Sequence, residues 1–294
     1  MAVGAYRMKR NARAAAESPR PAFWAFFILI GCLSAYPGTA RSNEGFTGGV
    51  TPSRFEISAS PGTTVRRSIE IYNLGQRPAK FTVATADWMY SETGRMSYSQ
   101  QLVADSCRPW VRLEAHEVTI VPDPRQARQY RFEVHVPDDA PPQECRFALM
   151  IESRDMNYTT QFQSAGISMP VSGRLAVIVY LAVGDVAPEL VLEGMEVQSV
   201  RGSRLPVVKV SNRGTAHGRL DADLAAVEAG GKRRLLSLST SPILAGQTRY
   251  MAISPVEDAS PLRFPLQVEG KIYAPGATFA IDSRLQDAPP EPES

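Results

Sequence analysis

The segment from Arg174 to Gly184, RLAVIVYLAVG, is the longest apolar run outside the first 40 residues. Its valine, isoleucine and tyrosine residues favour a strand, and the run is too short to span a membrane as a helix. Side chains of a strand alternate between two faces, and here both faces are apolar, although a strand in an antiparallel sandwich usually has one polar face. One face can enter a protein core. The other needs a cover, either from the same chain or from another protein.

Length and turn content set the expected architecture. The chain has 294 residues, enough for about two domains, and its 23 prolines and 21 glycines favour many short strands and turns. Short apolar or alternating segments begin at Ser53, and the pattern restarts after Asp185–Pro188, with seven more segments in roughly 95 residues. No long amphipathic helix is evident. We therefore predict an all-β protein with two tandem immunoglobulin-like β-sandwich domains, at 50–184 and 188–284, and a disordered tail at 285–294.

The first 40 residues have the features of an export signal. Basic residues precede the apolar segment Phe23–Leu33, and Gly38–Ala40 provides the small residues that a signal peptidase reads. We predict a signal peptide over 1–40 and a periplasmic location. Leu29–Cys32 also resembles a lipobox, so an outer-membrane lipoprotein with a lipid on Cys32 stays open as an alternative, and the chain would contact a membrane only in that case.

Charge and cysteine content exclude some functions. Loss of residues 1–40 removes five of the 32 basic residues and one of the 30 acidic residues, which leaves a net charge of −2 and no charge argument for nucleic acid. Cys107 and Cys145 would then be the only cysteines, and in an oxidising compartment we predict a disulfide between them. Two unpaired buried thiols are the alternative. The loop of 39 residues would add about 3–4 kcal/mol in the chain-entropy account.

No motif for catalysis or metal binding is evident. The histidines His116, His135 and His217 lack metal-ligand spacing, and the sequence has no G-x-S-x-G elbow, P-loop or G-x-G-x-x-G motif. We expect no enzyme activity, no metal and no cofactor. Among candidate binding residues, Arg54 and Arg174 stand out because each begins an apolar strand, where a guanidinium could hold a carboxylate with two hydrogen bonds.

Two short echoes suggest that the halves of the chain are related. Ile69–Gly75 and Val208–Gly214 share the pattern apolar-x-apolar-x-Asn-x-Gly, which is typical of a strand that ends in a turn. Arg128–Phe132 is echoed by Thr248–Ala252. Two similar sandwiches in tandem would explain both echoes, although chance could also produce them.

With strands, linker and signal in place, the chain resembles the periplasmic pilus-assembly chaperones of the chaperone–usher pathway. The resemblance extends from residue 50 to about residue 284. It is carried by Pro52-x-Arg54, Ile69-x-Ile71-x-Asn73, Trp88, Pro109–Leu113, the alternating strand that ends at Pro137, and Arg174–Tyr180.

The resemblance implies a fold and a binding mode. Such chaperones have two immunoglobulin-like domains with a subunit-binding cleft between them, and the last strand of the first domain is donated to an incomplete pilin subunit. The donated side chains would come from one face of the apolar strand, and which face donates stays open. The candidate donor residues are Leu175, Val177, Val179 and Leu181.

The resemblance also implies partners and a carboxylate site. Family members hold the subunit's C-terminal carboxylate with two basic residues, at places that match Arg54 and Arg174, although the family more often has lysine at the second place. The implied partners are pilin-like subunits, with an outer-membrane usher as a further candidate.

The chain departs from the family in three respects. Its first domain has extra segments at 95–106 and 153–165, the pair Cys107/Cys145 is not a general family feature, and the C-terminal tail is unusual. A relative could therefore have kept the fold and lost the pilus. Two hypotheses follow: a periplasmic chaperone-like protein that binds and caps pilus-type subunits by strand donation, and a structural or adhesive envelope protein without chaperone activity.

Overall fold

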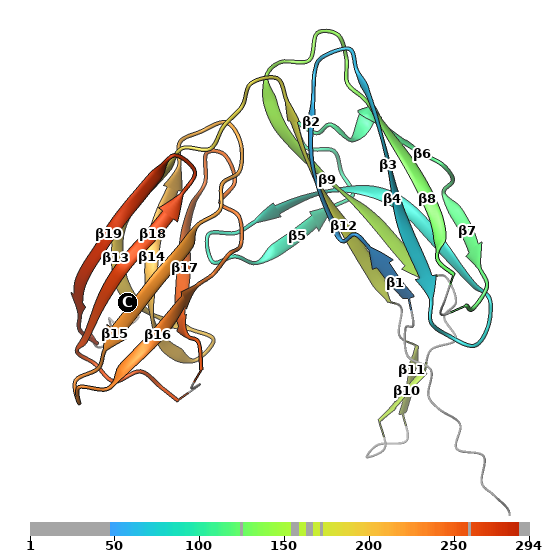
Figure 1. Ribbon diagram of the computed structural model, residues 1–294. Helices are drawn as coiled ribbons and strands as arrows, with labels where there is room; N and C mark the ends of the chain where they lie inside the picture. Colours follow the sequence, from blue (N-terminus) through green and yellow to red (C-terminus); the bar gives the residue numbers. More distant parts are fainter. Residues whose placement is uncertain are drawn as a thin grey trace, which may run out of the picture. The chain divides into compact units, whose positions relative to one another are not determined.

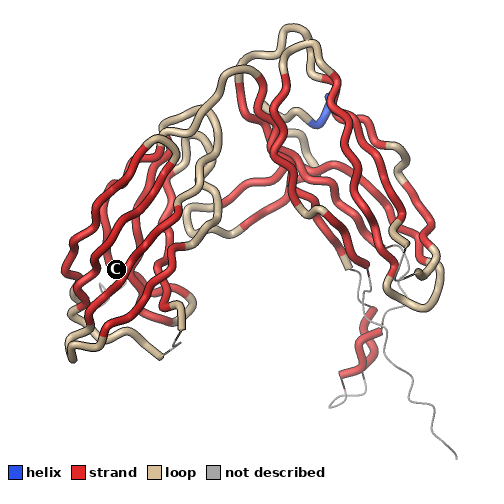
Figure 2. Tube along the Cα trace, in the orientation of Figure 1, coloured by secondary structure: helices blue, strands red, loops and turns tan. Residues whose placement is uncertain are grey.

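The computed structural model describes residues 48–123, 126–153, 159–162, 167–170, 173–257 and 260–287, without the side chains of 159–162 and 167–170. The predicted signal peptide, with Cys32, lies outside these residues, as does the tail from residue 288. Within the described ranges the chain is built of strands and turns, and its one helical element is the 3-10 turn η1 (Arg108–Trp110) (Figure 2). No helix in these ranges is long and apolar enough to cross a membrane. The predicted all-β class is confirmed.

The first half of the described chain is a sandwich of two sheets (Figure 1). One sheet has the strand order β1 (Gly48–Thr51), β3 (Thr64–Asn73), β8 (Arg128–His135), β6 (Val111–Leu113). The other has the order β2 (Arg54–Ala59), β12 (Arg174–Val183), β9 (Gln143–Ser153), β4 (Ala79–Tyr90), β5 (Met96–Ser99), with β7 (Glu117–Ile120) also paired to β4. A separate hairpin consists of β10 (Thr159–Phe162) and β11 (Ile167–Pro170). This distribution of strands is that of an immunoglobulin-like sandwich, as predicted.

The second half repeats this plan. Its strands follow the order β13 (Leu190–Val200), β14 (Ser203–Asn212), β17 (Thr248–Pro255), β16 (Arg233–Leu238), β15 (Asp221–Val227), β18 (Leu266–Ala274), β19 (Ala277–Leu285). Strand β17 joins the two layers, because it pairs first with β14 and then, from Ile253, with β16. Each half has its own buried apolar core. Leu285, the first residue of the expected tail, ends β19 and is buried.

Alternation of side chains builds both cores. In β8, Tyr130, Phe132 and Val134 are fully buried, and the residues between them are exposed or half-buried, as the period of two predicts. Apolar burial of this kind stabilises each sandwich by roughly 25 cal/mol per Å² of surface removed from water.

The repeated Asn-x-Gly pattern forms the same polar corner in both sandwiches. At the end of β3, the side-chain amide of Asn73 donates to the backbone oxygens of Arg77 (2.7 Å) and Ile120 (2.9 Å). Its Oδ1 accepts a hydrogen bond from the backbone N–H of Gly75 at 3.0 Å. Asn73 is 1% exposed, so these partners replace the water that a buried amide would otherwise lose.

Asn212, at the end of β14, makes the matching set of bonds. Its amide donates to the backbone oxygens of Ala216 (2.8 Å) and Ile243 (2.9 Å), and its Oδ1 accepts from Gly214 N–H at 2.9 Å. The spacing from the asparagine to its near partners is the same in both halves. The sequence echo therefore has a structural cause, namely one corner used twice.

We expect Asn73→Ala and Asn212→Ala each to lower the free energy of unfolding by about 2–3 kcal/mol, because each leaves buried backbone groups without partners. Urea unfolding followed by circular dichroism measures the change. The control is Thr119→Ala, an exposed position on β7, which should leave stability nearly unchanged. A loss below about 0.5 kcal/mol in both asparagine variants would contradict this account of the corner.

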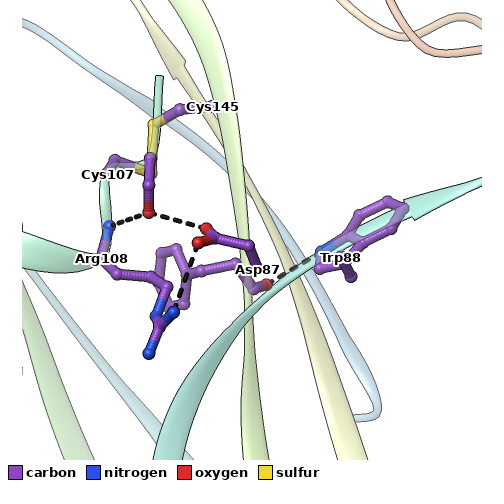
Figure 3. The surroundings of a disulfide bond; sticks show 7 residues. Asp87, Trp88, Cys107, Arg108 and Cys145 are labelled. Atoms are coloured by element: carbon purple, nitrogen blue, oxygen red, sulfur yellow. Dashed lines mark hydrogen bonds and ion pairs between the residues drawn. A yellow bond between two sulfur atoms is a disulfide. The ribbon is translucent and has the colours of Figure 1, made fainter. Parts of the chain in front are cut away.

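The predicted disulfide between Cys107 and Cys145 is confirmed, with Cα atoms 5.9 Å apart and both residues buried. It joins the segment before η1 to β9. Beside it, Arg108 forms an ion pair with Asp87 at 3.3 Å, and both side chains are nearly buried (Figure 3). Ser106 donates to Asp87 at 2.7 Å and accepts from the backbone N–H of Arg108. The disulfide and this polar cluster together fix the extra segment at 95–106 to the sandwich.

Replacement of both cysteines by alanine should lower the free energy of unfolding by about 2–5 kcal/mol, because the unfolded chain regains the freedom that the 38-residue separation restricts. Urea unfolding of the double variant and of the reduced wild-type protein should give similar losses. Equal stability of the oxidised and reduced proteins would refute a stabilising role for this bond.

Candidate functional site

Strand β12 has two partners of unequal length. It pairs with β9 along its whole length, from Arg174↔Glu152 to Val183↔Gln143, but it pairs with β2 only from Ile178↔Arg54 onward. Ile178 N–H donates to Ser53 O at 3.0 Å, on the β2 side. Because this direction repeats every second residue, Ala176 points its N–H and C=O to the same side. Among the strands that the structure describes, none pairs with that side of residues 174–177.

The inner face of β12 carries the residues that the resemblance suggested as donors. Val177, Val179 and Leu181 are 0% exposed in the core of the first sandwich, and Leu175 packs against this core. A side chain buried in the protein's own core cannot at the same time fill the groove of a partner. The donating face was left open by the sequence, and the four candidate donor residues lie on the inner face; the outer face of β12 carries Ala176, Ile178, Tyr180 and Ala182.

The outer face divides into a covered part and an open part. Tyr180 is 2% exposed, and the ring of His217, from the second half of the chain, stacks on it with centroids 4.0 Å apart. Trp88 meets the same tyrosine edge-on at 5.2 Å. Ala176 and Ile178, nearer the start of the strand, are only half-buried. The second apolar face is thus sealed by the chain itself near Tyr180 and remains accessible before it.

A pocket of about 500 Å³ opens over this accessible part. Its lining combines the start of β2 with the outer face of β12, Arg219 and a polar loop. The lining residues are Ser53, Arg54, Tyr90, Ala176, Ile178, Tyr180, Arg219, Ser239, Thr240, Ser241 and Pro242. The pocket therefore has an apolar floor and two guanidinium groups.

The two arginines of this pocket share one carboxylate. Arg54 Nε lies 3.3 Å from Glu56 Oε1, and Arg219 NH2 donates to the same oxygen at 3.1 Å. Arg219 also donates to Thr240 O and lies over the ring of Tyr180, 5.8 Å from its centroid. Two cations against one half-exposed anion leave a positive balance at the mouth of the pocket, which suits an incoming carboxylate.

Arg174 is not part of this pocket. Its terminal nitrogen NH2 donates to both carboxylate oxygens of Glu152, at 3.1 and 3.2 Å, and the two side chains are 52% and 37% exposed. Arg174 lies four positions before Ile178, which is the ladder partner of Arg54. Four positions along a strand span about 13 Å. The structure therefore does not bring Arg54 and Arg174 together, and the second guanidinium of the pocket is that of Arg219.

The surroundings of Glu56 and Tyr180 shift the pKa values of both side chains. Burial alone would raise the pKa of Glu56, but the charges of His217, Arg219 and Arg54 outweigh burial, and the pKa is lowered. Burial raises the pKa of Tyr180 to about 12, so this hydroxyl stays neutral at physiological pH. His217 is itself held by Glu144, whose oxygens accept from its backbone N–H (3.0 Å) and contact Nδ1 (2.6 Å).

We expect Arg219→Gln to raise the pKa of Glu56, because the variant removes a hydrogen bond and a positive charge. An NMR pH titration of the Glu56 carboxyl measures the change. Because the folded-state pKa is the lower one, the contribution of Glu56 to stability is present above its unfolded pKa, about 4.3, and is lost as the pH falls through the folded value. Arg66→Gln, next to Glu133, is the control. An unchanged Glu56 titration in Arg219→Gln would show that Arg219 does not hold this carboxylate.

Comparisons with known proteins give the following findings. No protein-family model matches the chain, and no curated protein sequence matches it. Among solved structures, the YadV chaperone is similar with a TM-score of 0.43 and 11% identity, over 81% of this chain and all of that one. The CsuC–CsuE complex of Acinetobacter baumannii gives 0.42 and 13%, over 82% and 100%. CupB2 of Pseudomonas aeruginosa gives 0.41 and 13%, over 80% and 99%.

These structures are chaperones. The Acinetobacter structure is a pre-assembly complex of a chaperone with a tip adhesion subunit from archaic chaperone–usher Csu pili.

Proposed function

We propose that the protein is a periplasmic chaperone-like protein that binds pilus-type subunits and caps them by β-strand donation. The observation that carries the proposal is the unpaired side of β12 at residues 174–177, next to a pocket with an apolar floor and two arginines.

Backbone geometry supports strand donation. An exposed strand edge binds a partner strand through ladder hydrogen bonds, and pockets for alternate side chains add specificity. Ala176 offers its N–H and C=O on the open side of β12. The same residue and Ile178 present half-buried apolar side chains on the outer face. A partner that lacks one strand could thus gain both ladder bonds and apolar contacts here.

The charges support an anchor for a carboxylate. Arg54 is about half exposed, and among the described residues its ion pair is with Glu56 through Nε, so its terminal nitrogens can donate hydrogen bonds to a further anion. Arg219 contributes a second guanidinium from the same pocket. A C-terminal carboxylate of a bound subunit would complete this site, with Arg54 and Arg219 in the roles first suggested for Arg54 and Arg174.

Capture of a subunit tests the proposal. The full chain is co-expressed in a bacterial periplasm with a pilin-type subunit from the same genome, from which the donor strand has been deleted, and the complex is purified by a tag on the subunit. We expect Ile178→Asp and Arg54→Gln each to reduce capture at least tenfold. Ile178→Asp places a charge on the apolar floor, and Arg54→Gln removes the carboxylate anchor.

Leu235→Asp is the matched control, because Leu235 is an apolar residue on β16 that is 58% exposed and outside the pocket. It should leave capture unchanged, and thermal unfolding confirms that all variants fold. Equal capture by the wild type, Ile178→Asp and Arg54→Gln would reject strand donation at this edge and favour a structural or adhesive role in the envelope.

A further inference from the structure

A second pocket, of about 490 Å³, lies at another part of the molecule and plays no part in the proposed function. We call it the Arg146 pocket. Its lining combines the last residues of β4 and β5 with the start of β9 and the turn after β14. The lining residues are Asp87, Trp88, Met89, Ser97, Tyr98, Ser99, Val103, Asp105, Pro142, Gln143, Glu144, Cys145, Arg146, Gly214, Thr215 and Ala245. This volume is within the range of small-ligand sites.

The guanidinium of Arg146 has no hydrogen-bond acceptor among the residues that the structure describes. Its Nε is buried and unpaired, and its recorded contact is with the ring of Trp88, whose centroid is 5.8 Å from the guanidinium carbon. A guanidinium carries five N–H donors, and leaving buried donors unpaired costs free energy. Arg108, close by, differs: its side chain donates to Thr85, Asp87 and Gln100.

Two of the three carboxylates that line the pocket are already engaged, and the third, Asp105, is exposed and forms no ion pair with Arg146 among the described residues. Asp87 accepts hydrogen bonds from Val103 N–H, Ser106 and Arg108. Glu144 accepts from the backbone of His217 and contacts its ring. Burial lowers the pKa of Arg146, whereas Glu144, Tyr180 and Asp87 raise it. An arginine stays charged at neutral pH, so the pocket holds a cation that lacks an acceptor.

Apolar side chains surround this cation. Four of the nine large apolar side chains that are exposed in the described residues lie between Met89 and Val103. Met89, Tyr98 and Val103 line the pocket, with exposures of 49%, 42% and 41%, and buried Trp88 forms part of its wall. An exposed apolar cluster around a polar centre is typical of a binding site.

We infer that the Arg146 pocket binds a carboxylate attached to an apolar or aromatic group. The carboxylate would accept hydrogen bonds from the terminal nitrogens of Arg146, and the apolar group would lie against Trp88, Tyr98 and Met89. A small organic acid and the C-terminal end of a polypeptide share this chemistry. The inference does not depend on the proposed function, because the Arg146 pocket shares no residue with the pocket that contains Arg54.

Titration of the full chain with matched probes tests the inference. 3-Phenylpropionate and 3-phenylpropionamide differ only in the charged group, and a tetrapeptide that ends in phenylalanine is used with a free or an amidated C-terminus. Isothermal calorimetry, with Trp88 fluorescence as a second readout, should show each acid binding at least tenfold more tightly than its amide. Tighter binding of the peptide acid than of phenylpropionate would identify a polypeptide end as the source, and the reverse a small organic acid.

Variants decide whether Arg146 is responsible. Arg146→Gln should weaken binding of the acids at least tenfold, and Arg146→Lys, which keeps the charge and loses the planar fork, should weaken it less. Arg54→Gln should leave binding unchanged, since it alters the other pocket. The inference would be overturned if no probe bound at millimolar concentration or if acid and amide bound equally well. It would also be overturned if the folded Arg146→Gln and Arg146→Lys variants both bound the acids as tightly as the wild type.

Discussion

The pairing of one strand decides what the first sandwich can offer to a partner. Every residue of a strand has one N–H and one C=O to satisfy, and in β12 those that point to β9 are satisfied along the whole strand. Those that point to the other side are satisfied only where β2 runs beside it. The result is a strand that is internal at one end and an edge at the other. The open side of β12 and the pocket with Arg54 lie where the pairing with β2 stops and the pairing with β9 continues.

The sequence was sufficient for the fold and for part of the site. Period-two alternation placed the strands, and the doubly apolar pattern of Arg174–Val183 correctly required a cover for the second face. That pattern could not say which face was internal, because both faces are apolar. The answer depends on which face of the sheet packs against the other sheet, and the structure assigns Val177 and Val179 to the core, together with Tyr130 and Phe132.

Long-range geometry explains what the sequence did not reveal. Arg219 is 165 residues from Arg54 in the chain, and no local pattern connects them, yet both contact Glu56. Strand β5 lies in the extra segment at 95–106, whose mostly polar residues show no apolar period of two. Backbone pairing with β4 makes it a strand. Asn73 and Asn212 are the opposite case, because a corner that is built from near neighbours repeats recognisably in the sequence.

The place of β12 in its sheet has a consequence for how the chain folds. It is the last strand of the first sandwich in sequence, but it lies between β2 and β9, and in that sheet β2 pairs with no other described strand. Synthesis proceeds from the N-terminus, so more than a hundred residues are made between β2 and its neighbour β12. Until β12 is made, β2 and later β9 each have an unpaired edge, and unpaired strand edges make folding chains prone to aggregation.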